Sequence, residues 1–156
     1  MFQKKRNTFH GGVHPYEGKE LSKDKPIVKA QPGNLLYYAV SQHIGAPAVP
    51  IVQKGDYVKV GQLIGDTDAF VSAPVHSSVS GTVKGIEEQR SAMGGNDTLV
   101  VIETDKKQEV YEGIAVPEAN DLPEFIKAIR ASGLVGLGGA SFPTHIKFNP
   151  KNIDEV

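Results

Sequence analysis

Between residue 35 and about residue 105, the sequence consists of short runs of β-branched or alternating apolar residues separated by turn residues. No segment of useful length with helical periodicity interrupts them. Such runs are typical of strands, and the glycines between them mark the corners where strands reverse. The runs are Val49–Val52, Tyr57–Val60, Leu63–Ile64, Ser80–Val83 and Leu99–Ile102, and the corner glycines are Gly55, Gly61, Gly65, Gly81, Gly85, Gly94 and Gly95. This region is therefore predicted to be an all-β unit.

Two half-motifs inside this region narrow the fold further. Val52–Gly65 contains the turn Gly-Asp-x-Val-x-x-Gly-Gln, and Ser72–Val83 contains Ala-Pro followed by Ser-Gly-Thr-Val. The Gly-Asp pair is expected to form a tight turn, with Val58 and Val60 pointing inward and Gly61 letting the chain double back. Together the two half-motifs resemble the biotinyl/lipoyl-like barrel-sandwich hybrid fold.

Carrier domains of that fold attach biotin or lipoate to a lysine at a hairpin tip. In this chain the link between the half-motifs is Asp66–Val71, and it contains no lysine. Without an amine no amide bond to the cofactor can form, and Lys54 and Lys59 lie in the wrong turn. We therefore expect no covalent biotin or lipoate, and a carrier function is the least favoured of three interpretations.

The periodicity changes to helical after Asn120. Asp121 is the expected N-cap, a proline and a glutamate follow in the first turn, and Gly133 is the expected C-cap. The apolar residues predicted to share one face of this helix are Leu122, Phe125, Ile126 and Ile129.

A glycine-rich segment, Gly133–Lys147, follows the predicted helix directly. Closely spaced glycines allow backbone N–H groups to approach a phosphate or a flat ring. The lysine can add a positive charge for the phosphate, and Phe142 or Phe148 can supply a stacking face. Glycine runs also form ordinary turns, so this segment alone does not establish a ligand site.

Five motifs occur in one order along the chain. They are Gly11–Pro15, Ser41–Ala48, the Gly-Asp…Gly-Gln turn, Ala73–Val83 and Gly133–Thr144. In this order they look like the N-terminal part of the RnfC family, the C subunits of the Rnf ion-translocating electron-transport complex. The resemblance runs from about Phe9 to Lys147. It implies a mainly β protein with some α: a barrel-sandwich hybrid followed by the start of an α/β flavin/NADH-binding domain.

The resemblance also implies a function. Family members are expected to form the peripheral, NADH-side subunit of a membrane-associated ferredoxin:NAD⁺ oxidoreductase, at the cytoplasmic face of the bacterial inner membrane. The expected partners are the other Rnf subunits, both membrane and iron–sulfur, and NADH. The chemistry would be hydride transfer between NADH and FMN, with the protein supplying orientation and phosphate binding.

The glycine-rich segment is also similar to that of the NADH- and FMN-binding subunit of respiratory complex I. By this analogy backbone contacts would come from Gly136, Gly138, Gly139 and Ala140. Lys147 would approach the FMN phosphate, and Phe142 or Phe148 would contact a ring. No catalytic side chain is expected.

The sequence departs from these relatives in three respects. Ser141 stands where the family usually has glycine, and Leu137 stands where complex I has an arginine. Family members also carry cysteine motifs for two [4Fe–4S] clusters, whereas this chain has no cysteine. We therefore expect a fragment of a longer protein that does not transfer electrons by itself.

Composition excludes few functions. The net charge of −1 gives no global basic field, so nucleic acid is not an expected partner. The basic start, residues 1–6, is not followed by an apolar run, so a membrane role would have to be peripheral. The expected organisation is an extended arm at 1–34, the barrel-sandwich hybrid at 35–117, and the helix with the glycine-rich segment at 118–156.

Two further interpretations concern binding. None of the five histidines lies at a spacing that would suggest a preformed metal site, so no metal is expected.

The alternative to a redox function is a non-catalytic docking module, in which the barrel holds the protein against membrane partners and the glycine-rich segment serves only structural packing. The Ser41–Ala48 loop is interpreted as a connection into the barrel, not as a ligand contact.

Overall fold

The computed structural model describes residues 15–91 and 94–149, and the chain divides into two units, residues 1–31 and 32–156. The described part of the first unit contains a turn at residues 20–24 and neither helix nor strand. Its apolar side chains are 84–102% exposed; they are Tyr16, Leu21, Ile27 and Val28. This segment therefore buries almost no apolar surface of its own. Residues 1–14 of the predicted arm, and with them most of the first motif of the resemblance, lie outside the described residues.

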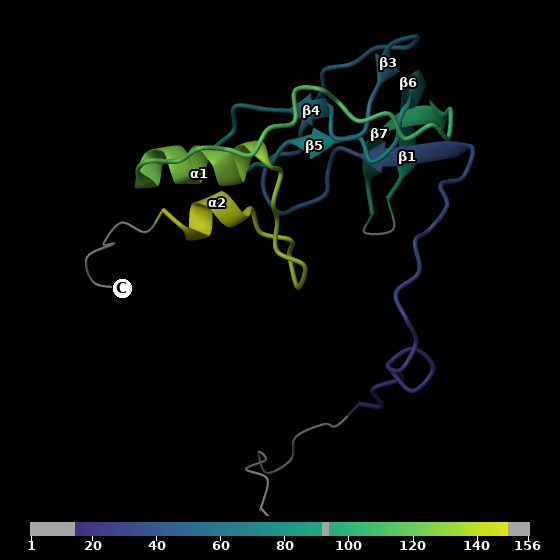
Figure 1. Cartoon of the computed structure of the whole chain (residues 1–156), viewed down its shortest axis with the longest axis horizontal. Coiled ribbons are helices and arrows are strands. Elements are labelled where there is room, and N and C mark those ends of the chain that lie inside the picture. Colours follow the sequence, from purple (N-terminus) through teal and green to yellow (C-terminus); the bar gives the residue numbers. More distant parts are fainter. Residues whose placement is uncertain (1–14, 92–93, 150–156) are drawn as a thin grey trace, which may run out of the picture. The chain divides into compact units, whose positions relative to one another are not determined.

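The second unit contains the strands and helices (Figure 1). The strands are β1 (Leu35–Ala39), β2 (Val49–Pro50), β3 (Tyr57–Val58), β4 (Leu63–Asp66), β5 (Val75–His76), β6 (Gly81–Arg90) and β7 (Asn96–Thr104). The helices are α1 (Leu122–Ala131) and α2 (Thr144–Lys147). One antiparallel sheet has the order β1-β7-β6-β3, and the other has the order β2-β4-β5. The prediction of a mainly β protein with some α is confirmed.

Strands β6 and β7 form a long hairpin of ten and nine residues. Gly94 and Gly95 have φ angles of 89° and 83° and follow β6, so the prediction of a corner there is correct. The prediction is wrong for Gly81 and Gly85, which lie inside β6, and for Gly65, which lies inside β4. A side chain at Gly81 would collide with a β7 carbonyl, and the β6–β7 register shifts beside Gly85, so these glycines serve sheet packing and a bulge.

The hydrophobic core draws on both sheets. Its most deeply buried side chains are 0–1% exposed; they are Val58, Ile64, Val83, Val100 and Ile102. Val58 therefore points inward as predicted. Val60 is only partly buried, because its backbone instead forms a bridge with Val110 outside the sheets.

The predicted turns at the start of the first half-motif are present. Gly55 has a φ of 98°, and the Asp56 carboxylate accepts a hydrogen bond from the Gln53 N–H at 2.9 Å. Gly61 has a φ of 82°, and the Ile114 side chain packs against it so closely that a Cβ would collide. This glycine thus both reverses the chain and admits the segment that leaves the barrel.

Helix α1 begins as predicted. The Asp121 side chain accepts a hydrogen bond from the Glu124 N–H at 2.8 Å, and a proline occupies the first turn. The helix ends at a Ser132 cap, with Gly133 one residue further on at a φ of 69°, so the predicted C-cap is off by one residue. None of its residues is buried, although α2 lies alongside it (Figure 1).

Candidate functional site: the glycine-rich loop

The glycine-rich segment folds back on itself between the two helices. Val135 and Pro143 form an antiparallel bridge, the Gly136 N–H donates to the Phe142 carbonyl at 3.0 Å, and the Thr144 N–H donates to the Leu134 carbonyl at 3.0 Å. These contacts close a loop over residues 134–144, which we call the glycine loop. Its ends are thereby held together, and its tip is presented to solvent.

The tip of the glycine loop carries uncommitted hydrogen-bond donors. Within the described residues, the backbone N–H groups of residues 137–142 have no protein acceptor. Gly139 has a φ of 63° and Ser141 a φ of 50°, so left-handed residues alternate with Ala140 between them. Alternation of this kind turns successive N–H groups toward one side, which is the geometry of an anion-binding nest. The tip can therefore accept an anion without breaking any internal bond.

Lys147 lies over the base of the glycine loop. A Cβ built on Gly136 would lie 3.3 Å from the Lys147 Nζ and 3.6 Å from the Phe142 N. Lys147 is exposed, and among the described residues its ammonium forms no ion pair. The ammonium thus places one positive charge at the base of the loop that carries the free N–H groups, and the absence of a side chain at Gly136 leaves room for it.

The fold brings only some of the predicted site residues together. Gly136, Phe142 and Lys147 are neighbours at the base of the glycine loop. Gly138, Gly139 and Ala140 form the exposed tip, and nothing lies within 4 Å of a Cβ placed on Gly138 or Gly139.

The two candidate aromatic side chains differ in their surroundings. The Phe148 ring packs edge-to-face on the Phe125 ring of α1, with centroids 5.6 Å apart. It is thereby engaged in holding the chain after α2 to α1. Phe142 is the aromatic side chain that remains at the glycine loop, where it is half-buried.

Ser141 occupies a position that its backbone explains. A φ of 50° lies in the left-handed region, where a residue with a Cβ is strained by roughly 1–2 kcal/mol and glycine is not. A glycine at this position, as the resemblance leads us to expect, would thus have a conformational reason, independent of ligand approach. Serine keeps the turn at some cost in stability and adds a hydroxyl group.

Sequence reasoning missed how the glycine loop is fastened to the barrel. The Ile44 N–H donates to the Ala140 carbonyl at 3.0 Å, so the loop predicted to be a simple connection touches the glycine loop directly. In the same connection, His43 accepts a hydrogen bond from the Ala73 N–H at 3.0 Å. The only advance signal was the position of His43 in a glycine- and proline-containing stretch, where imidazole often bonds to backbone.

His145 of α2 forms a second attachment. Its side chain is buried, its ring hydrogen-bonds the backbone of Phe70, and its Nδ1 has no partner in the described part of the chain. Burial lowers the pKa of His145, and the positive charge of Arg130 lowers it further, while the Phe70 backbone contact opposes the shift. The neutral imidazole is thus the form that fits between α2 and the barrel.

A third attachment joins α1 to the barrel through charge. The Arg130 guanidinium contacts the Asp66 carboxylate with both terminal nitrogens, at 2.8 and 3.3 Å, and donates to the Thr67 carbonyl at 2.6 Å. Burial raises the pKa of Asp66, but hydrogen bonds from Arg130 and from the Thr67 N–H outweigh it and leave the pKa below its ordinary value. The link that would display a carrier lysine is therefore packed against the C-terminal segment.

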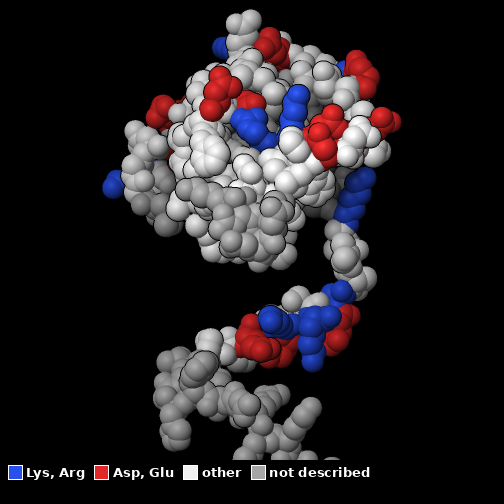
Figure 2. Space-filling model, turned by 90° about the vertical axis from the view of Figure 1, so that its left-hand side faces the viewer, with Lys and Arg blue, Asp and Glu red and all other residues white. Residues whose placement is uncertain are grey.

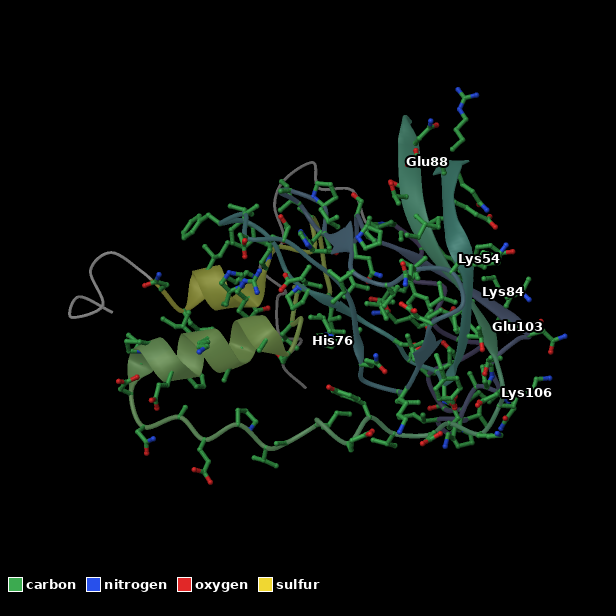
Figure 3. The ribbon with its side chains drawn as sticks, turned by 90° about the horizontal axis from the view of Figure 1, so that it is seen from above. Lys54, His76, Lys84, Glu88, Glu103 and Lys106 are labelled. Carbon is green, nitrogen blue, oxygen red and sulfur yellow. The ribbon has the colours of Figure 1, made fainter. Side chains whose placement is uncertain are left out.

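A cavity of about 490 Å³ lies elsewhere, between the barrel and the end of α1. It is lined by Gly61, Leu63, His76, Tyr111, Gly113, Ile114, Ala115, Pro117, Ala128, Ala131 and Ser132, so no glycine-loop residue borders it. Figure 3 shows His76 on the side of the barrel toward α1, far from Glu88 on the long hairpin. Burial lowers the pKa of His76, and the negative charge of Asp66 opposes this. The glycine loop is the better candidate site, because it carries free N–H groups along its length and a free positive charge at its base.

Charges on the surface are mixed. On the face shown in Figure 2, acidic and basic side chains are interspersed. Any attraction of an anion to the glycine loop would thus come from local groups, not from a broad field. Within the described residues no three histidine, aspartate or glutamate side chains are grouped closely enough to hold a metal ion.

Comparison with known proteins places the chain in a family. Residues 7–107 match the model of the RnfC barrel sandwich hybrid domain. The chain belongs to the RnfC family. The predicted resemblance and the barrel-sandwich hybrid fold are both confirmed by this match.

The similarity to individual RnfC relatives extends over more of this chain than the barrel domain alone. The C subunit of the proton-translocating ferredoxin:NAD(+) oxidoreductase complex of Clostridium ljungdahlii is 44% identical over 146 residues, which is 92% of this chain and 32% of that protein. The C subunit of the Na(+)-translocating ferredoxin:NAD(+) oxidoreductase complex of Acetobacterium woodii is 42% identical over 146 residues, 92% of this chain and 33% of that protein. The C subunit of an ion-translocating oxidoreductase complex of Vibrio cholerae is 35% identical over 140 residues, 87% of this chain and 18% of that protein. The chain thus spans about a third of the length of the first two relatives.

Proposed function

We propose that this chain is the N-terminal part of the RnfC subunit of an ion-translocating ferredoxin:NAD⁺ oxidoreductase complex, and that its glycine loop binds the phosphate of FMN or NADH. Relatives at 44% and 42% identity carry the name of that complex, which supports the assignment. The free N–H groups of residues 137–142, together with the Lys147 ammonium at the base of the same loop, support the ligand. The rest of the complex supplies the expected partners, at the cytoplasmic face of the membrane. No helix in the described residues is long and apolar enough to cross a bilayer.

The residues present fit a flavin phosphate better than a metal or a cluster. Backbone contacts would come from Gly138, Gly139 and Ala140, and Lys147 would pair with the phosphate. The N–H of Gly136, expected from the sequence to take part, is engaged by the Phe142 carbonyl, so Gly136 would only leave room for Lys147. Phe142 would contact a ring, since Phe148 is occupied by Phe125. When bound, FMN supplies the hydride chemistry, and the chain orients it and neutralises its charge. The two [4Fe–4S] clusters expected for the whole protein would require cysteines, which this chain lacks.

The organisation proposed for the chain follows from this function. Residues 1–34 would be an arm, residues 35–117 the barrel-sandwich hybrid, and residues 118–156 the start of a flavin/NADH-binding domain. Under this division the barrel supports the glycine loop through Asp66, Phe70 and Ile44.

Substitution of Lys147 tests the proposal. In the full-length protein, Lys147→Ala should weaken FMN binding by roughly 10- to 100-fold, because a hydrogen bond to a charged group contributes about 1.5–3 kcal/mol. The dissociation constant is measured by quenching of flavin fluorescence. Lys54→Ala is the matched control, because Lys54 is an exposed lysine in the first half-motif (Figure 3). Equal FMN affinity in wild type and Lys147→Ala removes Lys147 from the site.

A second candidate is a non-catalytic docking module. It is favoured by the exposed apolar side chains of residues 16–28, which bury almost nothing within their own unit. Hydrogen exchange separates the candidates: FMN or NADH should protect residues 136–147 in the full-length protein if the glycine loop binds them. Unchanged exchange with either ligand at saturating concentration favours the docking module.

A further inference from the structure

The ion pair between Arg130 and Asp66 joins the C-terminal segment to the barrel just before the glycine loop begins. Arg130 lies in the last turn of α1, three residues before Gly133, and Asp66 is the last residue of β4. Both side chains are 30% exposed. The guanidinium makes two contacts with the carboxylate and a third with the Thr67 carbonyl. Because of this geometry, the ion pair fixes both the distance and the orientation of the last turn of α1 relative to the end of β4.

Other contacts converge on the same part of the barrel, residues 66–74, which comprises the link Asp66–Val71 and the start of the second half-motif. A Cβ on Gly133 would lie 2.5 Å from the Pro74 carbonyl oxygen, so the chain passes directly over this part of the barrel after α1 ends. After the glycine loop, the buried His145 ring bonds the Phe70 backbone. Both ends of the glycine loop are therefore attached to one short stretch of the barrel, and Arg130 makes the ion pair among these attachments.

Apart from this ion pair, α1 is held by an apolar face that is only partly buried, including Ile126 and Ile129. No residue of α1 is buried, and its aromatic contact, Phe125 with Phe148, is made with the end of the C-terminal segment and not with the barrel. Packing of such a face stabilises the helix, whereas the directional contacts of Arg130 fix the orientation of its last turn. Loss of the ion pair should thus let the end of α1 move relative to β4.

We propose that Arg130, with Asp66 as its acceptor, is the positioning residue of the glycine loop: it does not contact the ligand but sets where the loop's N–H groups point. This inference rests on the proposed phosphate-binding function of the loop. Hydrogen bonds from backbone N–H groups to an anion are directional, so a displacement of the loop weakens them. The barrel would then tune ligand affinity without forming any part of the ligand contact.

The test uses the full-length protein with Arg130→Lys, Arg130→Gln, Asp66→Asn and the double variant Arg130→Gln/Asp66→Asn. Two quantities are measured: the hydrogen exchange, without ligand, of the hydrogen-bonded amides of Gly136, Thr144 and Ile44 that hold the loop, and the FMN dissociation constant. Lys127→Gln is the matched control, because Lys127 is an exposed cation on the same helix. Urea unfolding of each variant separates a folding defect from a local one.

We expect Arg130→Gln and Asp66→Asn each to weaken FMN binding by roughly tenfold, within the range of coupling between sites. The double variant should be no weaker than either single variant, because both remove the same contact. Arg130→Lys should fall between wild type and Arg130→Gln, since lysine keeps the charge but loses the two-pronged contact. Exchange of the bonded amides of Gly136, Thr144 and Ile44 should be faster in all of them, while Lys127→Gln behaves as wild type.

The outcomes that overturn the inference are distinct from those that overturn the proposed function. If wild type binds FMN and both single variants bind it equally well with unchanged exchange, Arg130 does not position the loop, although the loop still binds ligand. A loss of affinity in Arg130→Gln but not in Asp66→Asn means that Arg130 contacts the ligand itself, which also overturns it. If wild type binds neither FMN nor NADH, the proposed function fails, and the ligand-free exchange still decides whether Arg130 positions the loop.

Discussion

The barrel and the C-terminal segment, residues 122–148, are held together by different forces. The barrel buries side chains such as Val58, Ile64 and Ile102 completely, and both sheets contribute to this core. The C-terminal segment has no buried residue in its long helix. Apart from the fully buried Pro143, it depends on a salt bridge, a buried histidine and a few backbone contacts. Apolar burial tolerates small changes in direction, whereas these contacts do not. The barrel core thus contributes most of the free energy of folding, whereas the contacts of the C-terminal segment set the orientation of the glycine loop.

The largest effect should come from the barrel core. Ile102→Ala should lower the free energy of unfolding by about 3 kcal/mol, because it removes buried methylenes and leaves a cavity. Phe125→Ala, in α1, should lower it by only about 1 kcal/mol, since Phe125 is 42% exposed and mainly loses an edge contact. Urea unfolding of both variants measures the contrast. Equal losses would mean that the two regions are stabilised alike.

A smaller difference in stability is expected between alanine substitutions at two glycines of the C-terminal segment. Gly133→Ala should cost roughly 2 kcal/mol, because the φ of 69° is strained for alanine and its Cβ would crowd the Pro74 carbonyl. Gly138→Ala should change stability by less than about 0.5 kcal/mol, because nothing lies within 4 Å of its Cβ. Thermal unfolding measures both. A stability loss at Gly138 as large as that at Gly133 would show that the loop tip is packed against something.

The FMN affinity of Gly138→Ala sharpens the same contrast. If the loop tip approaches a phosphate closely, the added methyl group should weaken FMN binding even though stability is kept. A variant that loses neither stability nor affinity would place the ligand contact on residues other than Gly138.

A gradual effect of pH should come from the histidines at the junction of the two regions. Burial lowers the pKa of His145, with Arg130 and His43 adding to the shift, so the folded state binds fewer protons than the unfolded state below the ordinary pKa of 6.5. Stability is then fully present above that value and declines as the pH falls through it toward the folded pKa. His76, whose pKa burial also lowers, contributes in the same direction.

His145→Gln tests this pH dependence, since glutamine does not titrate. Urea midpoints measured between about pH 7.5 and pH 5.5 should fall less steeply in the variant than in wild type. His76→Gln is the comparison, because it removes the other junction histidine and leaves α2 unchanged. An identical slope in wild type and His145→Gln would contradict a lowered pKa at this position.

Much of the barrel was predictable because its signals are local. The Gly55–Asp56 turn, the inward-facing Val58 and the Asp121 cap all follow from residues a few positions apart. Gly81 and Gly85 were misassigned as corners for the same reason. A glycine required by a neighbouring strand or a bulge looks in sequence like a glycine in a turn.

The candidate site was predictable only in part. The composition of residues 133–147 indicated backbone donors and a lysine, and the fold places Lys147 beside Gly136. Arg130 and Asp66, 64 residues apart, carried no signal as a pair, because an arginine in a helix and an aspartate after a strand are ordinary on any surface. The role of the six amides at 137–142 stays a prediction until a ligand is measured.

By itself the sequence determined the strand-rich barrel, the helix cap, the lack of a lysine in the link and the lack of cysteine, since each depends on residue type or short-range spacing. Only the tertiary structure decided that residues 66–74 of the barrel receive both ends of the glycine loop, and that Phe148 pairs with Phe125 while Phe142 stays at the loop. These are contacts between segments far apart in the chain. Many pairs of segments have surfaces that could pack together, and only the packing of the whole chain decides which pairs are in contact.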